Sequence, residues 1–309
     1  MAAPAAPVNR RGAAPRDRLY VLLQSLLPQR TLSALAGRLA ASRVRWWKAL
    51  LIRAVVSLYR VDLAEAAVDD RRGYRSFNDF FTRALAPGAR PLAAAPAAVA
   101  CPVDGTLSHA GEVAAGRLFQ AKGHDCSLVE LLGGDTARAE PFQGGSFATL
   151  YLSPRDYHRV HMARGGRLAE MVRVPGRLFS VDAATTRALP GLFARNERVV
   201  SVFETGAGGA STSHPMALVM VGALLVAGIE TVWHGPVTPP RGGGVETWRY
   251  PAAGDGAVVL ERGAEMGRFN FGSTVFVLFG PGRVRWSDSL RPGARVHMGA
   301  AIGELVAQG

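Results

Sequence analysis

The chain has few cysteines, few lysines and no long apolar run. Its two cysteines, Cys101 and Cys126, stand apart without Cys-x-x-Cys spacing, so we expect reduced thiols and no disulfide framework. The longest uncharged apolar run, residues 216–229, has 14 residues and is too short to cross a bilayer as a helix. No segment has the apolar core and cleavage site of a secretory signal. These absences argue against a disulfide-rich secreted scaffold and against membrane-spanning helices.

The charge is large and unevenly distributed. Lys and Arg number 36 against 24 acidic residues, for a net charge of +12, and all but two of the basic residues are arginine. Residues 1–60 contain 11 basic residues and one acid, so they carry +10 (11 − 1), which leaves +2 (12 − 10) for the rest. A basic N-terminal segment predicts a polyanionic partner, and the lack of a nucleic-acid motif favours an anionic membrane over nucleic acid.

The clearest helical pattern lies in residues 43–60. At 100° per residue, one face gathers apolar side chains and the opposite face gathers cations. The apolar face comprises Trp47, Leu50, Leu51, Ala54, Val55 and Leu58, and the cationic face comprises Arg45, Lys48, Arg53 and Arg60. Two adjacent tryptophans beside cations are typical of a membrane interface, although the same stripe can pack on the protein's own core.

The rest of the chain divides by composition. Residues 1–16 predict a disordered basic tail, residues 17–83 a helical membrane-docking region, and residues 84–100 an Ala- and Pro-rich connector. Residues 101–309 contain short apolar runs divided by Gly and Pro, which predicts a β-rich, mainly antiparallel body. The expected strands are 147–152, 199–203, 217–226, 258–260 and 275–279. The predicted fold class is therefore α+β.

A small polar tripeptide, Gly272-Ser273-Thr274, interrupts the last apolar run. By itself Gly-Ser-Thr is ordinary turn or bulge chemistry. Two other segments supply the groups that activate a serine hydroxyl, Asp104 in Pro102-Val103-Asp104-Gly105 and a histidine pair in Asp156-Tyr157-His158-Arg159-Val160-His161. Asp104-Gly105 is equally a turn signal, so its carboxylate acquires a function only if it lies beside a histidine.

The histidine pair follows a helix-start signature. Ser153, Pro154 and Asp156 occupy the positions of an N-cap, N1 and N3 residue. A helix that starts there would put His158 and His161 on one face, three residues apart. From the residues alone, this pair can be packed side chains, general acid–base groups or metal ligands, and neither His-Glu-x-x-His nor clustered Cys supports a metal.

Gly272 offers Ser273 a target within the chain. The Gly-x-Ser-x-Gly elbow of α/β-hydrolases is absent. Glycine has no Cβ to hinder attack on its carbonyl carbon, and it tolerates a strained backbone. Attack by the Ser273 hydroxyl would turn the amide between the two residues into an ester. Elimination and hydrolysis would then leave a pyruvoyl group where the serine stood.

Longer stretches give these motifs their context. They are Tyr74-Arg75-Ser76-Phe77-Asn78-Asp79-Phe80-Phe81, Ala121-Lys122-Gly123-His124, Tyr151 to Met162, Leu192-Phe193-Ala194-Arg195-Asn196-Glu197-Arg198, Ile229-Glu230-Thr231-Val232-Trp233, and Glu265-Met266-Gly267-Arg268-Phe269 running into Gly272-Ser273-Thr274. In this order they resemble bacterial phosphatidylserine decarboxylase proenzymes, over nearly everything from residue 46 to residue 306. Phe271 and Ala163 depart from the residues usual in that family, leucine and proline, and leave the reactive groups intact.

The resemblance implies a role for each site residue. Ser273 is expected to be the self-cleavage serine and the precursor of a covalently bound pyruvoyl group, with Gly272 as the new C-terminus. His161 is expected to be the base that activates Ser273, Asp104 its orienting partner, and His158 the acid–base group of decarboxylation. The substrate amine would form a Schiff base with the ketone, which accepts electrons as CO2 leaves. No metal is implied.

The resemblance also implies partners. A β chain of residues 1–272 and an α chain of residues 273–309 would remain together, and such units would pair as a homodimer. The expected substrate is phosphatidylserine in an anionic membrane, reached by peripheral binding at the cytoplasmic face. The alternatives are a non-catalytic membrane-bound β domain, a metal-dependent enzyme that uses Asp104, His158 and His161, and the same chemistry on another serine lipid, such as an ether lipid.

Overall fold

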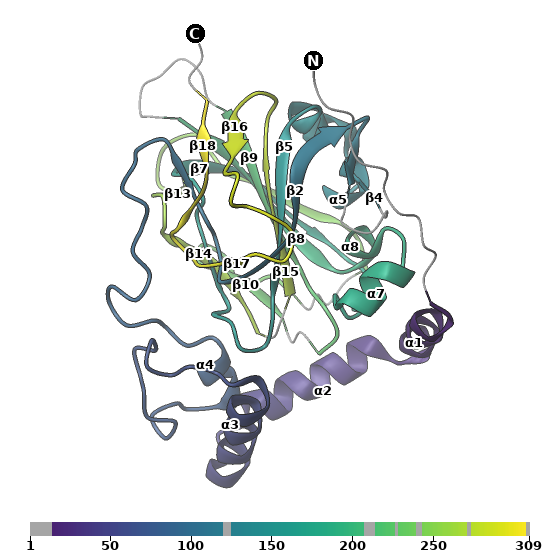
Figure 1. Ribbon diagram of the computed structural model, residues 1–309, viewed down its shortest axis with the longest axis vertical. Coiled ribbons are helices and arrows are strands. Elements are labelled where there is room, and N and C mark those ends of the chain that lie inside the picture. The colour runs from purple at the N-terminus through teal and green to yellow at the C-terminus, as the bar shows by residue number, and fades with distance from the viewer. Residues whose placement is uncertain are drawn as a thin grey trace.

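Helices open the chain and a β-rich body follows them (Figure 1). The computed structural model describes residues 14–119, 125–206, 214–225, 228–238, 243–270 and 273–306. The helices are α1 (Pro15–Leu26), α2 (Gln29–Ala41), α3 (Arg45–Tyr59), α4 (Phe77–Phe81), α5 (Leu128–Leu131), α6 (Thr136–Ala139), α7 (Ala183–Ala188), α8 (Leu192–Arg195) and the 3₁₀ turn η1 (Glu140–Phe142). The strands are β1 (Ala98–Ala100), β2 (Gly105–Ala114), β3 (Arg117–Phe119), β4 (Asp125–Ser127), β5 (Ser146–Leu152), β6 (Arg159–His161), β7 (Gly166–Val174), β8 (Arg198–Thr205), β9 (His214–Val221), β10 (Ile229–Thr231), β11 (Gly235–Pro236), β12 (Glu246–Arg249), β13 (Val259–Leu260), β14 (Glu265–Phe269), β15 (Ser273–Phe279), β16 (Val284–Trp286), β17 (Arg295–Val296) and β18 (Ala301–Leu305).

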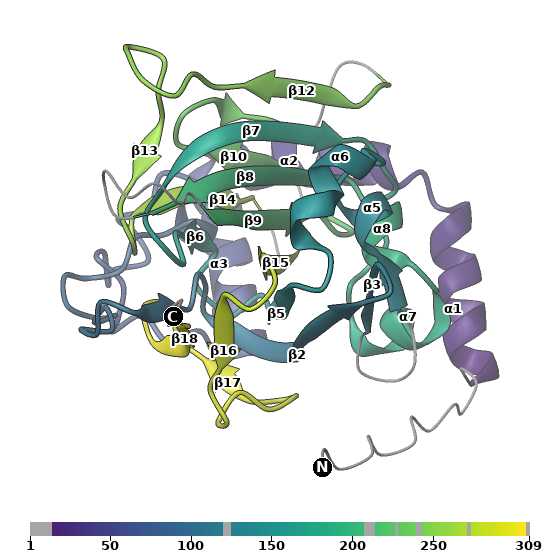
Figure 2. The same ribbon diagram turned by 90° about the horizontal axis from the view of Figure 1, so that it is seen from above.

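The named strands form three sheets, and every strand pair in them is antiparallel. The main sheet has the order β12-β7-β8-β9-β15-β5-β2-β3-β4, with β13 added beside β7 and β17 beside β2 (Figure 2). Two smaller sheets have the orders β11-β10-β14-β6 and β1-β18-β16. This arrangement confirms the predicted α+β class with a mainly antiparallel, β-rich body.

Strand β15 separates two hydrophobic cores. Because side chains of a strand alternate between its faces, Val275, Val277 and Phe279 enter one core, while Phe276 and Leu278 enter the other. The first core lies between the main sheet and the two small sheets, and the second lies between the main sheet and α5–α8. A strand buried on both faces reads as a continuous apolar run, which is why the sequence predicted it.

Helices α1 and α2 are polar on the inside and apolar on the outside. The buried side chains of α1 are Asp17 and Gln24, and Gln24 Nε2 donates to Thr185 Oγ1 at 3.0 Å. The exposed leucines of the two helices are Leu19, Leu22, Leu23, Leu26, Leu35 and Leu39. Figure 1 shows these helices along one edge of the body. The usual amphipathic pattern of a surface helix is therefore reversed.

Helix α3 presents apolar groups on both sides. Ile52 and Val56 are buried, whereas Leu50 and Leu58, which belong to the predicted apolar face, are exposed. Lys48 does not belong to an outward cationic face as predicted, because its Nζ donates to the carbonyl oxygens of Arg72 and Tyr74. These backbone acceptors hold the ammonium group inside the helical region.

Three predicted boundaries differ from the structure. Helix α1 begins at Pro15, two residues before the predicted helical region, and residues 1–13 lie outside the described residues. The connector ends in a strand, because β1 pairs with β18. Strand β9 covers His214–Val221 and ends before the predicted limit of residue 226, because the chain leaves the sheet at Gly222. There the Gly222 N–H donates to Glu197 O.

Arg262 ties the connector to the body. Its Nη1 donates to the carbonyl oxygens of Ala95 and Ala98 at 2.6 and 3.1 Å, and its Nη2 donates to Ala93 O at 2.9 Å. Arg164 Nη1 also donates to Ala98 O, at 3.0 Å. These bonds give the Ala- and Pro-rich connector a defined path without secondary structure along most of its length.

Replacing Arg262 by methionine removes these hydrogen bonds and keeps much of the side-chain volume. We expect the free energy of unfolding to fall by about 1–3 kcal/mol, because the connector carbonyls lose charged donors. Urea titration followed by circular dichroism measures the change. The control is Arg285→Met, which removes an exposed guanidinium 3.5 Å from Glu304 and should cost less than about 0.5 kcal/mol. Equal free energies of unfolding for the two variants would contradict the conclusion that the Arg262 hydrogen bonds hold the connector on the body.

Candidate active site

The segment between β5 and β6 is a turn, so the predicted helix after Ser153 is wrong. Asp156 N–H donates to Ser153 O at 2.9 Å, and Ser153 N–H donates to Asp156 Oδ2 at 2.7 Å. The Asp156 carboxylate is buried and also accepts from Arg295 at 2.8 Å. The cap-like turn forms, but the chain then extends because β6 pairs with β14. Long-range strand pairing therefore overrides the local helix signal.

His158 is a neutral, buried imidazole. Its Nδ1 lies 2.8 Å from Asp156 O, and because a carbonyl oxygen only accepts, Nδ1 carries the proton. Its Nε2 therefore bears a lone pair, and this atom has no hydrogen-bond partner among the described residues. The ring packs on Phe81 with the ring centres 4.0 Å apart. Burial lowers the pKa of His158 to about 3.

His161 has partners on both ring nitrogens. Nδ1 lies 2.8 Å from Gly263 O, so it donates there, and Nε2 lies 3.0 Å from the Tyr157 hydroxyl and accepts from it. Burial is the main cause that lowers the pKa of His161. The hydrogen bond to Gly263 O and the Glu265 charge oppose the shift, and Asp104 opposes it least. His158 precedes β6 and His161 ends it, so they do not share a helical face as predicted.

Asp104 is buried among cationic and backbone donors. Arg90 Nε and Nη2 donate to its carboxylate at 3.0 and 2.6 Å, and Met298 N–H donates at 2.8 Å. The hydrogen bond that links this segment to His161 runs between backbones, from His161 N–H to Pro102 O at 2.8 Å. Direct orientation of His161 by Asp104 stays a prediction, while in this structure Gly263 O accepts from the imidazole.

Residue 105 must be glycine because the backbones of β2 and β5 approach each other closely there, and not because the chain turns at this position. It opens β2, and a Cβ placed on it would lie 2.3 Å from the carbonyl oxygen of Tyr151 in β5. Only glycine allows that approach. The Asp-Gly pair therefore places Asp104 at the point where β2 joins the end of β5.

Ser273 is the first residue of β15, and its backbone lies opposite Leu152, the last residue of β5. Phe271 and Gly272 lie outside the described residues, as does the side chain of Ser273. The C-terminal end of β14 lies in the same region, because Phe269 N–H donates to His158 O at 3.0 Å. The chain leading to the serine therefore passes the backbone of His158. The turn of residues 153–158, here called the histidine turn, follows β5, the strand beside the serine.

The sequence prediction missed several site residues. Tyr157 stood between the predicted aspartate and histidine, but its bond to His161 depends on side-chain direction. Arg90 and Phe81 lie in separate segments, and only the fold brings them to Asp104 and His158. Their signal in the sequence was weak, because Arg is abundant and Phe81 belongs to a run that also builds the core of the helical region.

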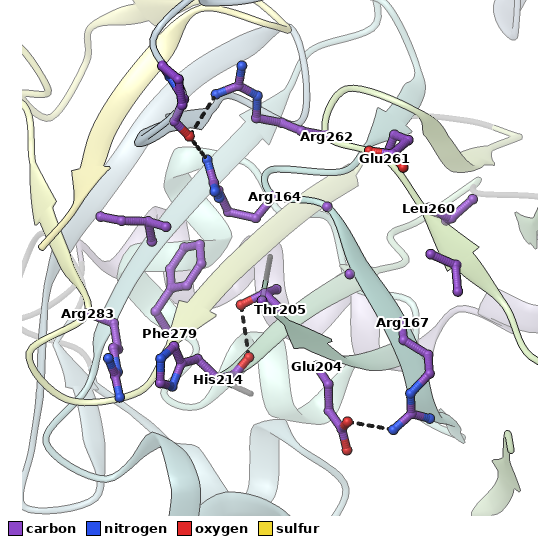
Figure 3. Close-up of a pocket in the computed structure, with 16 residues that line it drawn as sticks. Arg164, Arg167, Glu204, Thr205, His214, Leu260, Glu261, Arg262, Phe279 and Arg283 are labelled. Atoms are coloured by element: carbon purple, nitrogen blue, oxygen red, sulfur yellow. Dashed lines mark hydrogen bonds and ion pairs between the residues drawn. The ribbon is translucent and has the colours of Figure 1, made fainter. Parts of the chain in front are cut away.

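A hollow lies at the far end of β15, away from Ser273. It has a volume of about 700 Å³, and its lining includes Phe279, His214, Arg283 and the paired residues Arg167 and Glu204 (Figure 3). Figure 3 also shows Arg164 and Arg262 directed at one backbone oxygen of the connector. None of the predicted site residues lines this hollow. Within the described residues, no three His, Cys, Asp or Glu side chains gather as a metal-binding group.

Comparison with known proteins assigns the chain to a family. The sequence model of the phosphatidylserine decarboxylase family matches residues 77–304. The chain belongs to the phosphatidylserine decarboxylase family. A second family model, described as PSD, matches residues 19–60. The family assignment thus covers the body and a separate match covers the N-terminal helices.

Curated relatives of this decarboxylase family align with almost the whole chain. A phosphatidylserine decarboxylase proenzyme of Pseudomonas putida is 54% identical over 291 residues, which cover 94% of this chain and 99% of the relative. Proenzymes of the same description from Stutzerimonas stutzeri and Azotobacter vinelandii are 53% and 54% identical over 289 residues, covering 95% and 99% of those relatives. The predicted resemblance is therefore confirmed.

The neutral state of His158 makes stability depend on pH. Its pKa is about 3 in the fold against an ordinary value of 6.5, so the unfolded chain binds more protons between these values. Stability should therefore fall as pH drops below about 6.5, by up to about 1.4 kcal/mol per pH unit from this group. In His158→Gln, urea titrations at several pH values should give a shallower loss.

The matched control for this experiment is His234→Gln, which alters an exposed histidine. Its stability should follow the wild-type curve. The same pH slope in His158→Gln and in wild type would show that His158 is not the buried neutral group.

Proposed function

We propose that this chain is a phosphatidylserine decarboxylase that matures by cutting itself between Gly272 and Ser273 and carries a pyruvoyl group made from Ser273. The observation that supports this most directly is the family match, which runs through Ser273 and continues to residue 304. The position of Ser273 at the start of β15, next to the end of β5, is consistent with it. Residue 152 of β5 is followed at once by the histidine turn.

The described residues fit a pyruvoyl group at position 273. The open Nε2 of His158 is a buried polar atom without a described partner, and Phe81 gives it an apolar wall. When present, the group supplies a ketone that binds the substrate amine and accepts the electrons released with CO2. Ser273 provides its atoms, and β5 and β9 hold the strand behind it.

His158 is suited to move one proton in both directions. The substrate ammonium must lose a proton before its nitrogen can act as a nucleophile. The lone pair on His158 Nε2 can accept that proton once the anionic substrate beside the ring raises the pKa of His158 from its value of about 3. The carbon that loses CO2 must later gain a proton, and the same Nε2 can return it. Nδ1 stays bound to Asp156 O, which fixes the ring and its tautomer.

His161 is proposed as the base for self-cleavage, with Asp104 acting on it through charge. Tyr157 currently donates to its Nε2, so activation of Ser273 requires that this bond be exchanged or that the tyrosine hydroxyl relay the proton. Gly263 O and Glu265 are the main groups that raise the pKa of His161 against burial, and the Asp104 charge adds a smaller contribution in the same direction. Arg90 and Met298 hold the Asp104 carboxylate in place.

Two variants separate maturation from turnover. Ser273→Ala should remain one chain of 309 residues by intact mass under denaturing conditions, because the attacking hydroxyl is gone. His158→Ala should still give two chains, one ending at Gly272 and one starting with a blocked residue 273. Its release of CO2 from phosphatidylserine should fall by about 10²–10⁴-fold. The wild-type protein, cut and active, is the reference.

A His158→Ala protein that matures and decarboxylates normally would contradict the role of His158. An uncut, inactive wild-type protein would instead contradict the proposed function as a whole.

We further propose that the helical region binds peripherally to the surface of an anionic membrane, without crossing the bilayer. None of the described helices is long and apolar enough to cross a bilayer. Trp46, Leu26 and Leu58 are 70%, 74% and 74% exposed, and the arginines of residues 1–60 supply the positive charge. Exposed apolar groups beside cations suit the interface of an anionic bilayer.

The triple variant Leu26→Ser, Trp46→Ser and Leu58→Ser tests this surface. Sedimentation with phosphatidylglycerol-containing vesicles should show at least a tenfold loss of binding, because each removed side chain contributes about 1.5–3 kcal/mol when buried in lipid. Activity on soluble dihexanoyl phosphatidylserine should stay near wild type. The control is Val259→Ser, which removes an exposed apolar residue of the body.

Unchanged vesicle binding would contradict membrane docking. If the triple variant instead changes from dimer to monomer in size-exclusion chromatography, the apolar surface belongs to the proposed homodimer.

A further inference from the structure

Arg83, just after α4, is a buried cation with open donors. It is 5% exposed, and its Nη2 donates to Arg155 O at 3.2 Å. Its guanidinium lies over the ring of Phe80, with Cζ 5.4 Å from the ring centre. Nε and Nη1 have no hydrogen-bond partner among the described residues, and no described carboxylate forms an ion pair with it. Burying such donors without a hydrogen-bond acceptor costs free energy. A bound anionic ligand would supply the missing acceptors to Nε and Nη1.

Nearby acids are already committed to other cations. Burial lowers the pKa of Arg83, and nearby Tyr74, Asp104 and Asp156 oppose that shift and favour the cation. However, the Asp104 carboxylate is bound by Arg90, and the Asp156 carboxylate is bound by Arg295. Neither carboxylate forms an ion pair with Arg83.

Arg83 belongs to the wall of the proposed active site. It binds the carbonyl of Arg155, and the next residue, Asp156, accepts the hydrogen bond of His158. Phe81, two residues before Arg83, packs on the His158 ring. Asn78 of α4 donates to Asn270 Oδ1 at 3.2 Å, on the segment that leads to Ser273.

Unpaired polar atoms gather at this wall. Asn78 Oδ1, His158 Nε2, and Nε and Nη1 of Arg83 are all buried without a hydrogen-bond partner among the described residues. They come from α4, from Arg83 two residues after its end, and from the histidine turn. A polar ligand that presents both donors and acceptors would satisfy all of them.

The chemistry of the substrate decides which anion Arg83 takes. Phosphatidylserine carries a phosphodiester, which stays throughout the reaction, and a carboxylate, which must leave as CO2. A guanidinium on the carboxylate would stabilise its charge before departure and oppose the reaction. A guanidinium on the phosphodiester binds substrate and transition state alike, and its fork geometry matches two phosphate oxygens.

We propose that Arg83 binds the phosphodiester of the substrate and thereby positions the serine headgroup at His158 and residue 273. This inference rests on the proposed function. Arg155 of the histidine turn and Arg159 of β6 are less suited to the role. Arg159 is occupied by Glu265 and by Thr82 O, and the Arg155 side chain is half exposed.

The test uses soluble substrate, so that membrane binding does not enter the kinetics. In Arg83→Gln, KM for dihexanoyl phosphatidylserine should rise about 10–100-fold, while kcat falls less than fivefold and cleavage at residue 273 is complete. Arg83→Lys keeps the charge without the fork and should give a smaller rise in KM. The control is Arg155→Gln, whose KM should stay within twofold of wild type.

A binding measurement separates phosphate from carboxylate recognition. Glycerophosphoethanolamine, which has the phosphodiester and no carboxylate, should raise the melting temperature of wild type and leave that of Arg83→Gln unchanged. Serine should affect both proteins equally, and inorganic phosphate at the same concentration should affect neither. This readout does not depend on turnover.

Several outcomes would overturn the proposal. They are an unchanged KM in Arg83→Gln, equal stabilisation of both proteins by glycerophosphoethanolamine, or loss of the serine effect alone. An Arg83→Gln protein that fails to fold, together with wild-type kinetics in Arg83→Lys, would identify a structural cation. If wild type is cut and active, these results reject only the role of Arg83, whereas an uncut, inactive wild type rejects the proposed function.

Discussion

The ladders on both sides of β15 are the constraint on which the rest of the site depends. Its residues pair with β5 from Ser273 to Phe279 and with β9 from Thr274 to Phe279, and its side chains divide between two cores. A strand held in this way cannot shift by one residue without exchanging the two cores. The first residue of the strand therefore has a fixed backbone position, while the histidine turn starts from the strand beside it.

Regular elements were predictable because their signals are local. The apolar runs of β5, β8 and β15 and the helical period of residues 43–60 appear directly in the sequence, and the structure contains them. The prediction of a helix after Ser153 was wrong because the local capping pattern competes with the pairing of β6 with β14, and β14 lies in a distant part of the sequence. Neither Arg90 on Asp104 nor Tyr157 on His161 was predictable, because both contacts depend on side-chain direction in the finished fold.

The helical region combines two opposite requirements. Its inner side uses Gln24, Gln29 and Lys48 to bind side-chain and backbone groups of the protein, and Val21 of α1 adds an apolar contact to the core beside α5–α8. Its outer side leaves leucines exposed. Hydrogen bonds depend on direction more strongly than apolar contacts do. They therefore fix how the helices are rotated, and with that the orientation of the exposed leucines relative to α4. That helix joins the N-terminal region to Phe81 and the histidine turn.

The pairing of the last strands has a consequence for the proposed cut between residues 272 and 273. The 37 residues after Gly272 (309 − 272) contain β15 in the middle of the main sheet, β17 beside β2, and β16 and β18 in the sheet of β1. Both ends of this piece are thus interwoven with the longer one. The two products of this cut would stay together as long as the sheets stay folded, because the strands of the shorter piece lie in sheets that the longer piece completes. Each molecule would therefore retain the single pyruvoyl group that it forms at residue 273. An enzyme whose pyruvoyl group has been inactivated would have to be replaced by a newly synthesised polypeptide.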